Sequence, residues 1–382
     1  MDCVQELYAD KDLSLLKKLT LIIPTHNRNF YLSRCLWYHG HFPFAEIIVA
    51  DSSVEEKRVV NRETVQKIQD LFGAHITYLE YDYPAEEYGG EIYRKWCDSV
   101  QHTVTDYSEF CTDKEFLIPT EICASIQFLI DHPDYVTAEG CVYQIREYPK
   151  GTTEYNPWQD VPSVISDNPH ERLYTALERT TGTLFSVYHT NILKIIYDNL
   201  NKYSLYDIRF GETALEIQPL ILGKIYKDLT SPMRCRDIRH TKDPSPIISK
   251  IEKNESSFTR YRKYNEYPKE RFNQLGKNLE MCIYDLLADM NDGKKQLQWD
   301  GEQLVQKILD KRYNSDYGLY NKYPLIQQAW NIAPIPLQRW FLKLMKEKRM
   351  YFSSSEISPE VDRINLLIEQ FEKYYADDLP IY

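Results

Sequence analysis

LTLIIPTHNR, residues 19–28, is the stretch that decides the fold expected for this chain. Its first five residues form a continuous apolar and β-branched run, as in a strand that is buried on both faces. Pro24 ends the run. A helix is expected to follow from about Arg28 to Tyr38, with Asn27 placed to cap it and Gly40 placed to end it.

The same order of strand and helix repeats through the first third of the chain. The expected strands and helices are residues 46–50, a helix marked by Val59 and Leu71 that ends at Gly73, residues 76–79, and a helix through residues 93–104. Alternation of this kind predicts an α/β fold with a mainly parallel, doubly wound sheet.

Ligands of such sheets bind beyond the carboxyl ends of the strands, where the loops converge. Three polar segments follow apolar strands directly: residues 24–28, residues 51–53, and residues 112–115 after a short strand at 109–111. We therefore expect the functional site where these three loops meet.

From about residue 250 the pattern becomes helical. One amphipathic helix is marked by Leu275 to Met290, another by Leu337 to Leu344, and the last is opened by Ser358-Pro359. We predict a catalytic α/β domain over residues 1–248 and a helical extension over residues 249–382, which either packs on the sheet or mediates self-association.

Composition excludes several classes of protein. The chain has 382 residues, a formal net charge of −11, 43% hydrophobic and 27% charged residues, which is typical of a folded protein and unlike one that binds nucleic acid through basic surfaces. None of its eight cysteines forms a CxxC pair, so buried reduced thiols are favoured over disulfides or a zinc site.

The sequence also favours a cytoplasmic location. Four acidic residues at positions 2, 6, 10 and 12 precede any apolar run, which is not the pattern of a secretion signal. No stretch approaches the roughly 18 apolar residues of a transmembrane helix. We expect any membrane contact to be peripheral, at the inner face.

Three motifs carry a resemblance to a known family. TLIIPTHNR at 20–28, IIVADSS at 47–53 and TDKEF at 112–116 resemble the inverting family-2 glycosyltransferases of the GT-A fold. The resemblance covers residues 18–145 well and extends weakly to about residue 245. It implies nucleotide contacts from Pro24, Thr25, Asn27 and Arg28, and recognition of the base by Asp51. A residue at the position of Asp51 is also typical of a helix cap.

The third motif implies a metal site. The family holds Mn²⁺ or Mg²⁺ and the diphosphate with Asp-x-Asp, which Asp113 matches, whereas Glu115 replaces the second carboxylate. Residues two apart on an extended segment point the same way, and a hard divalent ion suits carboxylate oxygens. The alternative is a solvated turn with three charges.

Two further segments are similar to functional parts of the family. Inverting transfer needs a base that accepts the proton of the acceptor hydroxyl. Glu212 is the favoured candidate, with Asp207 and Glu216 in reserve; a helix-start carboxylate near the dipole is the alternative. In the basic cluster of residues 234–242, the resemblance implies His240 as a third metal ligand and Arg239 as a phosphate ligand. The alternative is a structural histidine.

The function expected from the sequence is sugar transfer from a nucleotide-sugar donor, UDP- or GDP-linked, to a glycan or lipid-linked glycan acceptor. A sugar nucleotidyltransferase is disfavoured because residues 24–28 contain no glycine with which to cradle a triphosphate. A degenerate GT-A domain that binds sugar without turnover is the remaining alternative, because the metal motif is altered.

Overall fold

The computed structural model describes residues 8–84, 89–147, 153–154, 162–178, 182–237, 269–290, 307 and 359–374. A single sheet runs through the molecule in the order β3-β2-β1-β4-β8-β6-β9-β5, with β7 paired to β6 off this path. Its strands are β1 (Leu19–Thr25), β2 (Glu46–Asp51), β3 (Ile76–Glu80), β4 (Tyr107–Phe110), β5 (Glu115–Leu117), β6 (Tyr135–Glu147), β7 (Thr153–Glu154), β8 (Val187–His189) and β9 (Lys224–Asp237).

The first four strands form the parallel half of the sheet. β1 lies between β2 and β4 and is parallel to both, and β2 is parallel to β3. Because Thr25 pairs with Asp51, and Asp51 pairs with Glu80, the carboxyl ends of β1, β2 and β3 lie level with one another. This register brings the loops that follow these strands to one edge.

The second half of the sheet is mixed. β8 is antiparallel to β4 and to β6, and β5 is antiparallel to β9, whereas β6 and β9 are parallel. The β6–β9 pairing is irregular on both sides of Gly140, where an added Cβ would meet the backbone oxygen of Ser231 at 2.6 Å. β5 pairs with β9 through Glu115↔Arg236, which places a basic strand beside the TDKEF segment.

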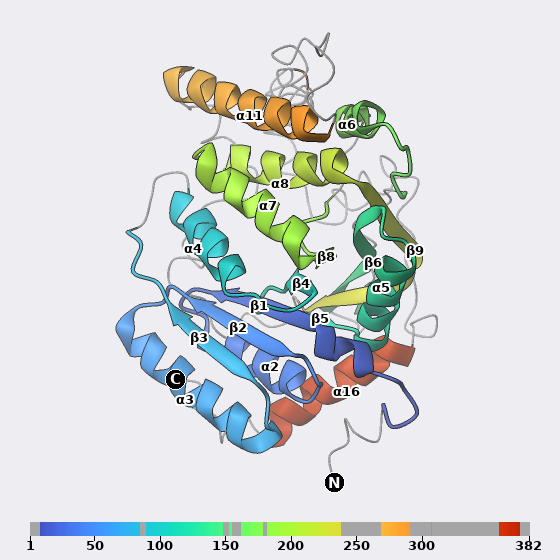
Figure 1. The fold of residues 1–382 in the computed structure, drawn as a ribbon. Helices are drawn as coiled ribbons and strands as arrows, with labels where there is room; N and C mark the ends of the chain where they lie inside the picture. The colour runs from blue at the N-terminus through green and yellow to red at the C-terminus, as the bar shows by residue number, and fades with distance from the viewer. Residues whose placement is uncertain are drawn as a thin grey trace, which may run out of the picture.

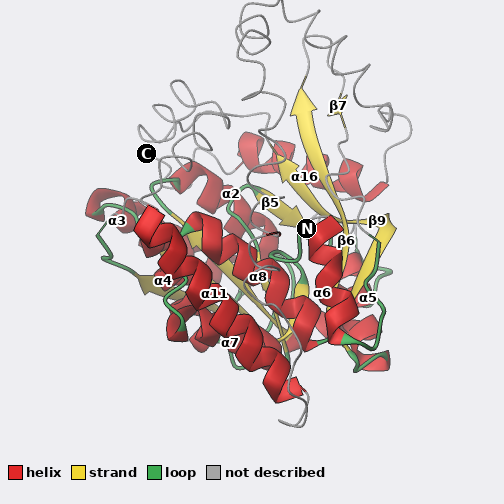
Figure 2. Ribbon diagram, turned by 90° about the horizontal axis from the view of Figure 1, so that it is seen from above, coloured by secondary structure: helices red, strands yellow, loops and turns green. Residues whose placement is uncertain are grey.

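Helices cover both faces of the sheet (Figure 1). On one face lie α2 (Asn29–Gly40), α3 (Glu55–Phe72), α5 (Pro119–Asp131), the short 3-10 helix η1 (Ser14–Lys18) and α16 (Pro359–Tyr374). On the other face lie α4 (Gly90–Gln101), α7 (Thr190–Lys202), α8 (Ile208–Leu222) and α11 (Lys269–Met290), with α6 (Pro169–Glu178) packed on α8. From above, α11, α8 and α7 lie next to one another (Figure 2).

Two of the helices predicted for the extension are among the described residues, and each enters one of the two cores. Leu279, Ile283 and Leu287 of α11 are buried with α7 and α8. Ile364, Leu367 and Phe371 of α16 are buried with α2. The helix expected at residues 337–344 lies outside the described residues. The described part of the extension therefore packs on the helices that cover the sheet.

The predicted α/β fold class, with its mainly parallel sheet and helical C-terminal part, is confirmed. Local boundaries differ for physical reasons. Pro24 does not end β1 but pairs with Ala50 inside it. Asn27 has φ 56°, in the left-handed region, and does not cap α2. Gly73 ends α3 as expected, at φ 66°.

Other sequence predictions concern thiols and membranes. The seven described cysteines are all buried and free, as expected for reduced thiols. Among the described helices, none combines the length and the apolar composition that crossing a bilayer requires.

Candidate functional site

The loops after β1, β2 and β4 meet at the carboxyl edge of the sheet. Thr25, the last residue of β1, donates its hydroxyl hydrogen to Asp113 Oδ2 at 3.0 Å. The backbone N–H of Ser52, after β2, donates to the Thr25 carbonyl at 3.2 Å. The three segments selected from the sequence are thus in direct contact.

His26 and Asn27 fasten the first loop to the second. The Nδ1 atom of His26 lies 2.8 Å from the Ser52 carbonyl oxygen. The backbone N–H of Asn27 donates to Ser53 Oγ at 2.7 Å, and its side-chain oxygen accepts the N–H of Val54 at 2.9 Å. The Asn27 side chain therefore accepts a hydrogen bond at the start of α3 and does not cap α2.

Asp51 lies beneath the surface of this edge. It is fully buried, and its carboxylate accepts hydrogen bonds from the Ser53 N–H at 2.7 Å, from Asn61 Nδ2 at 2.6 Å and from the Tyr78 hydroxyl. Both oxygens are engaged within the chain, so this carboxylate shapes the loop from below. Burial, together with the hydrogen bond to Asp51, raises the pKa of Tyr78.

Asp113 is paired with Arg28. The guanidinium Nη1 of Arg28 lies 2.8 Å from Asp113 Oδ1, and Asp113 is 1% exposed. Burial raises the pKa of Asp113 despite the opposing effects of Arg28 and the Thr25 hydrogen bond. Arg28 and Asp113, both predicted to contact the donor, thus form one ion pair.

Glu115 is held by β9. Its Oε1 accepts hydrogen bonds from Nε of Arg236 at 2.8 Å and from Nη2 of the same residue, and its Oε2 accepts the Thr112 N–H at 3.2 Å. Burial would raise the pKa of this carboxyl, but the charges of Arg234 and Arg236 hold it below its ordinary value. The basic segment noted in the sequence therefore reaches the TDKEF motif through Arg234 and Arg236, whereas Arg239 and His240 lie outside the described residues.

These partners decide how well the motif suits a divalent ion. Each Asp113 oxygen faces a donor from Thr25 or Arg28, and the Glu115 oxygens face Arg236 and a backbone N–H. A cation entering here would have to displace positively charged side chains from buried carboxylates. The described residues of the motif therefore do not fit the metal that the resemblance implies.

One other cluster has metal-ligand side chains. The Cys35, His39 and Cys111 ligand atoms lie within 4.8 Å of one another, buried behind the TDKEF loop. His39 Nε2 accepts the Leu117 N–H at 3.2 Å, and its Nδ1 lies 2.9 Å from the Cys35 carbonyl oxygen, which requires a donor. Both ring nitrogens are thus used in structural hydrogen bonds, which does not suit a metal ligand.

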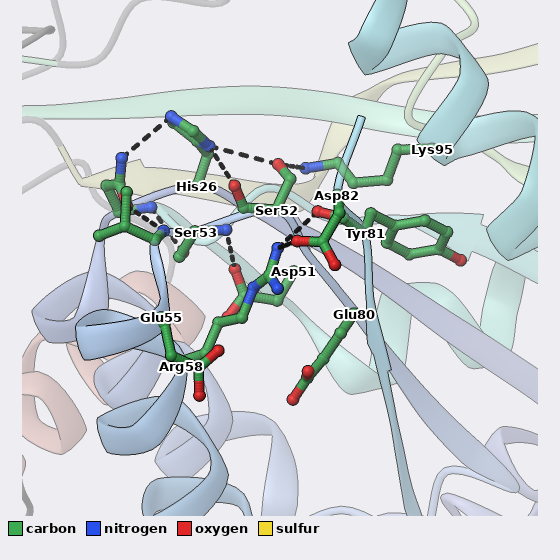
Figure 3. A network of polar contacts seen from close by, with 12 residues as sticks. His26, Asp51, Ser52, Ser53, Glu55, Arg58, Glu80, Tyr81, Asp82 and Lys95 are labelled. Carbon is green, nitrogen blue, oxygen red and sulfur yellow. Dashed lines mark hydrogen bonds and ion pairs between the residues drawn. The ribbon is translucent and has the colours of Figure 1, made fainter. Parts of the chain in front are cut away.

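A hollow of about 410 Å³ opens above Asp51. Its walls come from the loop after β2, the start of α3 and the loop after β3 (Figure 3); its lining residues are Ser52, Ser53, Val54, Glu55, Arg58, Tyr81, Asp82 and Tyr83. Arg58 fixes the β3 side, because its Nη2 donates to the Tyr81 carbonyl at 2.6 Å and pairs with Asp82 at 2.6 Å. The Tyr81 and Tyr83 rings are stacked at 5.8 Å.

Lys95 of α4 joins the strand ends from above. It is 4% exposed, and its Nζ donates to the Thr25 carbonyl at 2.9 Å. The same Nζ donates to Ser52 Oγ at 2.8 Å (Figure 3). Burial lowers its pKa from 10.5 to about 8, against the attraction of Asp51 and Asp113. Nothing in the sequence pattern marked Lys95 as a residue of the site.

The lowered pKa of Lys95 predicts a pH-dependent stability. Between pH 8 and 10.5 the unfolded chain holds the Lys95 proton and the folded chain releases it, so the folded state gains stability as pH rises. Relative to Lys95→Met, the wild type should gain up to about 3 kcal/mol of unfolding free energy between pH 7 and pH 10.5. Urea denaturation at several pH values measures this, and a difference that is constant with pH would contradict it.

The three candidate bases lie just before or within the first nine residues of α8, in different environments. Asp207 is buried, accepts the Phe210 N–H at 2.9 Å and so caps the helix. Glu212 is exposed and Glu216 is partly buried. The helix approaches α4 closely, because a Cβ on Gly211 would lie 2.6 Å from the Tyr93 ring. Tyr93 is two residues from Lys95, so α4 links the start of α8 to the loop edge.

Comparison with known proteins gives only distant likenesses. No protein-family model matches the chain, and no curated protein matches it. Solved structures with a similar fold include S. aureus TarS 1–349 in complex with UDP, with 11% identity and a TM-score of 0.45, covering 85% of this chain and 78% of that one. A complex of the same TarS fragment with UDP-GlcNAc is 13% identical, with a TM-score of 0.42 and 80% and 92% coverage.

A third similar structure is glucosyl-3-phosphoglycerate synthase from Mycobacterium tuberculosis in complex with Mn²⁺, UDP and glucosyl-3-phosphoglycerate. It is 11% identical, with a TM-score of 0.32, and the match covers 63% of this chain and 81% of that one. At this distance the likeness concerns the course of the chain and carries no argument about substrate.

Proposed function

We propose that this chain is a glycosyltransferase that moves a sugar from a UDP- or GDP-linked donor to a glycan or lipid-linked glycan acceptor, with inversion. The observation that carries the proposal is the meeting of three polar loops at the carboxyl edge of the parallel strands, beside a hollow of about 410 Å³. Cationic side chains, Arg28 and Lys95, lie at the same edge.

The geometry suggests a role for each wall of the site. The hollow has an aromatic wall at Tyr83, which is 39% exposed, and polar groups at Ser52 and Ser53. A nucleobase would stack on the ring and bond to the polar groups. Asp51, which is buried below, would act by holding these groups in place. The diphosphate would then lie toward Arg28, with Pro24, Thr25 and Asn27 shaping the loop around it.

The transfer itself requires a base and a stabilised leaving group. We assign the base to Glu212, because it is the exposed carboxylate at the start of α8 and neighbours the Gly211–Tyr93 contact with α4. The acceptor oxygen bonds to the anomeric carbon as its proton passes to Glu212. The bond from that carbon to the diphosphate breaks, and the electron pair leaves with the diphosphate.

The proposed acceptor class and the proposed cellular location rest on the family resemblance alone. A lipid-linked glycan acceptor would place the enzyme at the inner face of the membrane as a peripheral protein. A homo-oligomer through the helical extension belongs to the same proposal. Mass measurement by light scattering would report the oligomeric state.

Nucleotide binding tests the proposed function most directly. UDP or GDP at about 100 times its dissociation constant should stabilise the protein by about 2.7 kcal/mol in a thermal-shift panel that includes CDP and CMP. Removing the aromatic wall by Tyr83→Ala should weaken binding about 5- to 160-fold, since stacking on a base contributes about 1–3 kcal/mol. The control is Tyr174→Ala, a 54% exposed tyrosine of α6 outside the hollow, which should bind as the wild type does.

Two results would count against the assignment. If none of the nucleotides stabilises the protein, the transferase proposal is lost. If Tyr83→Ala and Tyr174→Ala bind the nucleotide equally well, the nucleobase does not bind in this hollow.

A sugar-binding module without turnover is the second candidate. It is favoured by one observation, that both carboxylates of the TDKEF motif are engaged by arginine side chains. Persistent binding of a nucleotide sugar without its consumption, in the presence of acceptor glycans, would select this candidate over the enzyme.

A further inference from the structure

We propose that cationic side chains of the chain itself, Arg28 and Lys114 on the ring of Tyr31, hold the donor diphosphate in place of a divalent ion. This inference rests on the proposed function and deepens it, because it concerns how the same site balances the charge of its donor. It departs from the metal use that the family resemblance implies.

Both carboxylates of the TDKEF motif are already paired with side chains of the protein. Asp113 is 1% exposed and faces Arg28 and the Thr25 hydroxyl, and Glu115 is fully buried against Arg236. An incoming Mn²⁺ or Mg²⁺ would meet like charge at both. Breaking a buried ion pair leaves an uncompensated charge, which is strongly unfavourable. The carboxylates therefore serve to orient arginine side chains.

The ring of Tyr31 forms a platform for several cationic side chains. The Arg28 guanidinium carbon lies 4.7 Å from the centre of the Tyr31 ring, and Lys114 Nζ lies 4.6 Å from it. The Arg34 guanidinium carbon lies 5.6 Å from the same ring. The negative face of an aromatic ring attracts cations, so Tyr31, itself 1% exposed, allows these like charges to lie close together.

Two hydrogen-bond donors of Arg28 are unsatisfied by the residues that the structure describes. Within the described part of the chain, its Nε and Nη2 are buried and have no acceptor. Buried donors without a partner cost about 1–3 kcal/mol each, so these two nitrogens call for an acceptor, which a bound anion would supply. The planar fork of a guanidinium matches two oxygens of a phosphate. An oxyanion at this position would satisfy both nitrogens.

Charge balance at the edge points the same way. Arg28, Lys114 and Arg34 contact one ring, and Lys95 lies at the adjoining strand ends, whereas the carboxylates at this edge are Asp113, which pairs with Arg28, and Asp51, which attracts Lys95 from below. The chain as a whole carries a net charge of −11, so this cluster is a local reversal of sign. The negative charge that builds on the leaving diphosphate would be met by side chains that are already in place.

Calorimetric titration of wild-type protein with UDP and with GDP, each in EDTA and in excess Mn²⁺, tests the inference. We expect the tighter of the two nucleotides to bind with a dissociation constant that changes less than about twofold between the conditions. Arg28→Gln and Lys114→Gln should each weaken that nucleotide at least tenfold, about 1.4 kcal/mol, in EDTA. Binding of the nucleoside, which lacks phosphate, should stay unchanged in both variants.

The matched control is Lys202→Gln, which removes a 59% exposed lysine of α7 that pairs with Asp285. It should bind UDP and GDP as the wild type does. Because the comparison of EDTA with Mn²⁺ uses wild-type protein, it stands even if Arg28→Gln fails to fold, and the partly exposed Lys114 gives a second variant.

Nucleotide binding that is lost in EDTA and restored more than tenfold by Mn²⁺ would overturn the inference while leaving the proposed transferase intact. Full-affinity binding by both Arg28→Gln and Lys114→Gln would overturn it as well. An absence of UDP and GDP binding in every condition would remove the proposed function and this inference with it.

Discussion

Replacing Glu212 by alanine is expected to slow sugar transfer by about 10²- to 10⁴-fold and to leave nucleotide affinity unchanged, because a positioned general base contributes an effect of that size. Glu212 is exposed at the start of α8, beside Gly211, where the helix backbone lies against the Tyr93 ring of α4. The other end of this contact path is Lys95, which holds the ends of β1 and β2. In the proposed mechanism Glu212 acts on the acceptor and does not contact the nucleotide, so only the transfer step should respond to its loss.

The measurement is single-turnover transfer from the donor identified by thermal shift, with nucleotide affinity determined in parallel. Glu216→Ala is the matched control, since Glu216 is one helical turn away and partly buried. If Glu216→Ala is slow and Glu212→Ala is fast, the base is Glu216. Asp207 is a poor choice for such a test, because it caps α8 through the Phe210 N–H and its loss would disturb the helix itself.

The parallel half of the fold could be predicted from the sequence because each element there has a clean pattern. β1 and β2 are nearly continuous apolar runs, and α3 ends at Gly73 in the left-handed conformation that glycine adopts without strain. β9 had no such pattern. It carries Lys227, Arg234 and Arg236, whose charges are paired with Glu139 and Glu115 inside the fold. A strand that buries ion pairs does not resemble a buried strand in sequence.

The sequence predicted where the candidate site lies, but only some of the residues that form it. The rule that ligands bind after the carboxyl ends of strands selected the loops of β1, β2 and β4, and these three do meet. Applied also to β3, it would have selected Tyr81 and Tyr83, which line the hollow. Lys95 gave no such signal, because a lysine in an amphipathic helix is usually a solvated residue. The engagement of Asp51 and Asp113 by other side chains is a tertiary property that spacing does not reveal.

The second large effect concerns the C-terminal helix. Phe371 of α16 is fully buried and packs on α2, with its ring 6.3 Å from that of Phe30 and 5.8 Å from that of Trp37. Phe371→Ala is therefore expected to lower the free energy of unfolding by about 3–5 kcal/mol, the usual cost of removing a buried phenylalanine side chain. Urea denaturation followed by circular dichroism measures the loss.

Leu366→Ala is the matched control on the same helix, because Leu366 is 43% exposed and its truncation should change stability by less than about 0.5 kcal/mol. The comparison also bears on the donor site, since α2 begins one residue after Arg28 and carries Tyr31. If α16 anchors α2, Phe371→Ala should weaken UDP or GDP binding through the Tyr31 platform, and Leu366→Ala should not. Equal stability of the two variants would show that α16 does not pack on α2 in solution, and the helix would then be available for self-association.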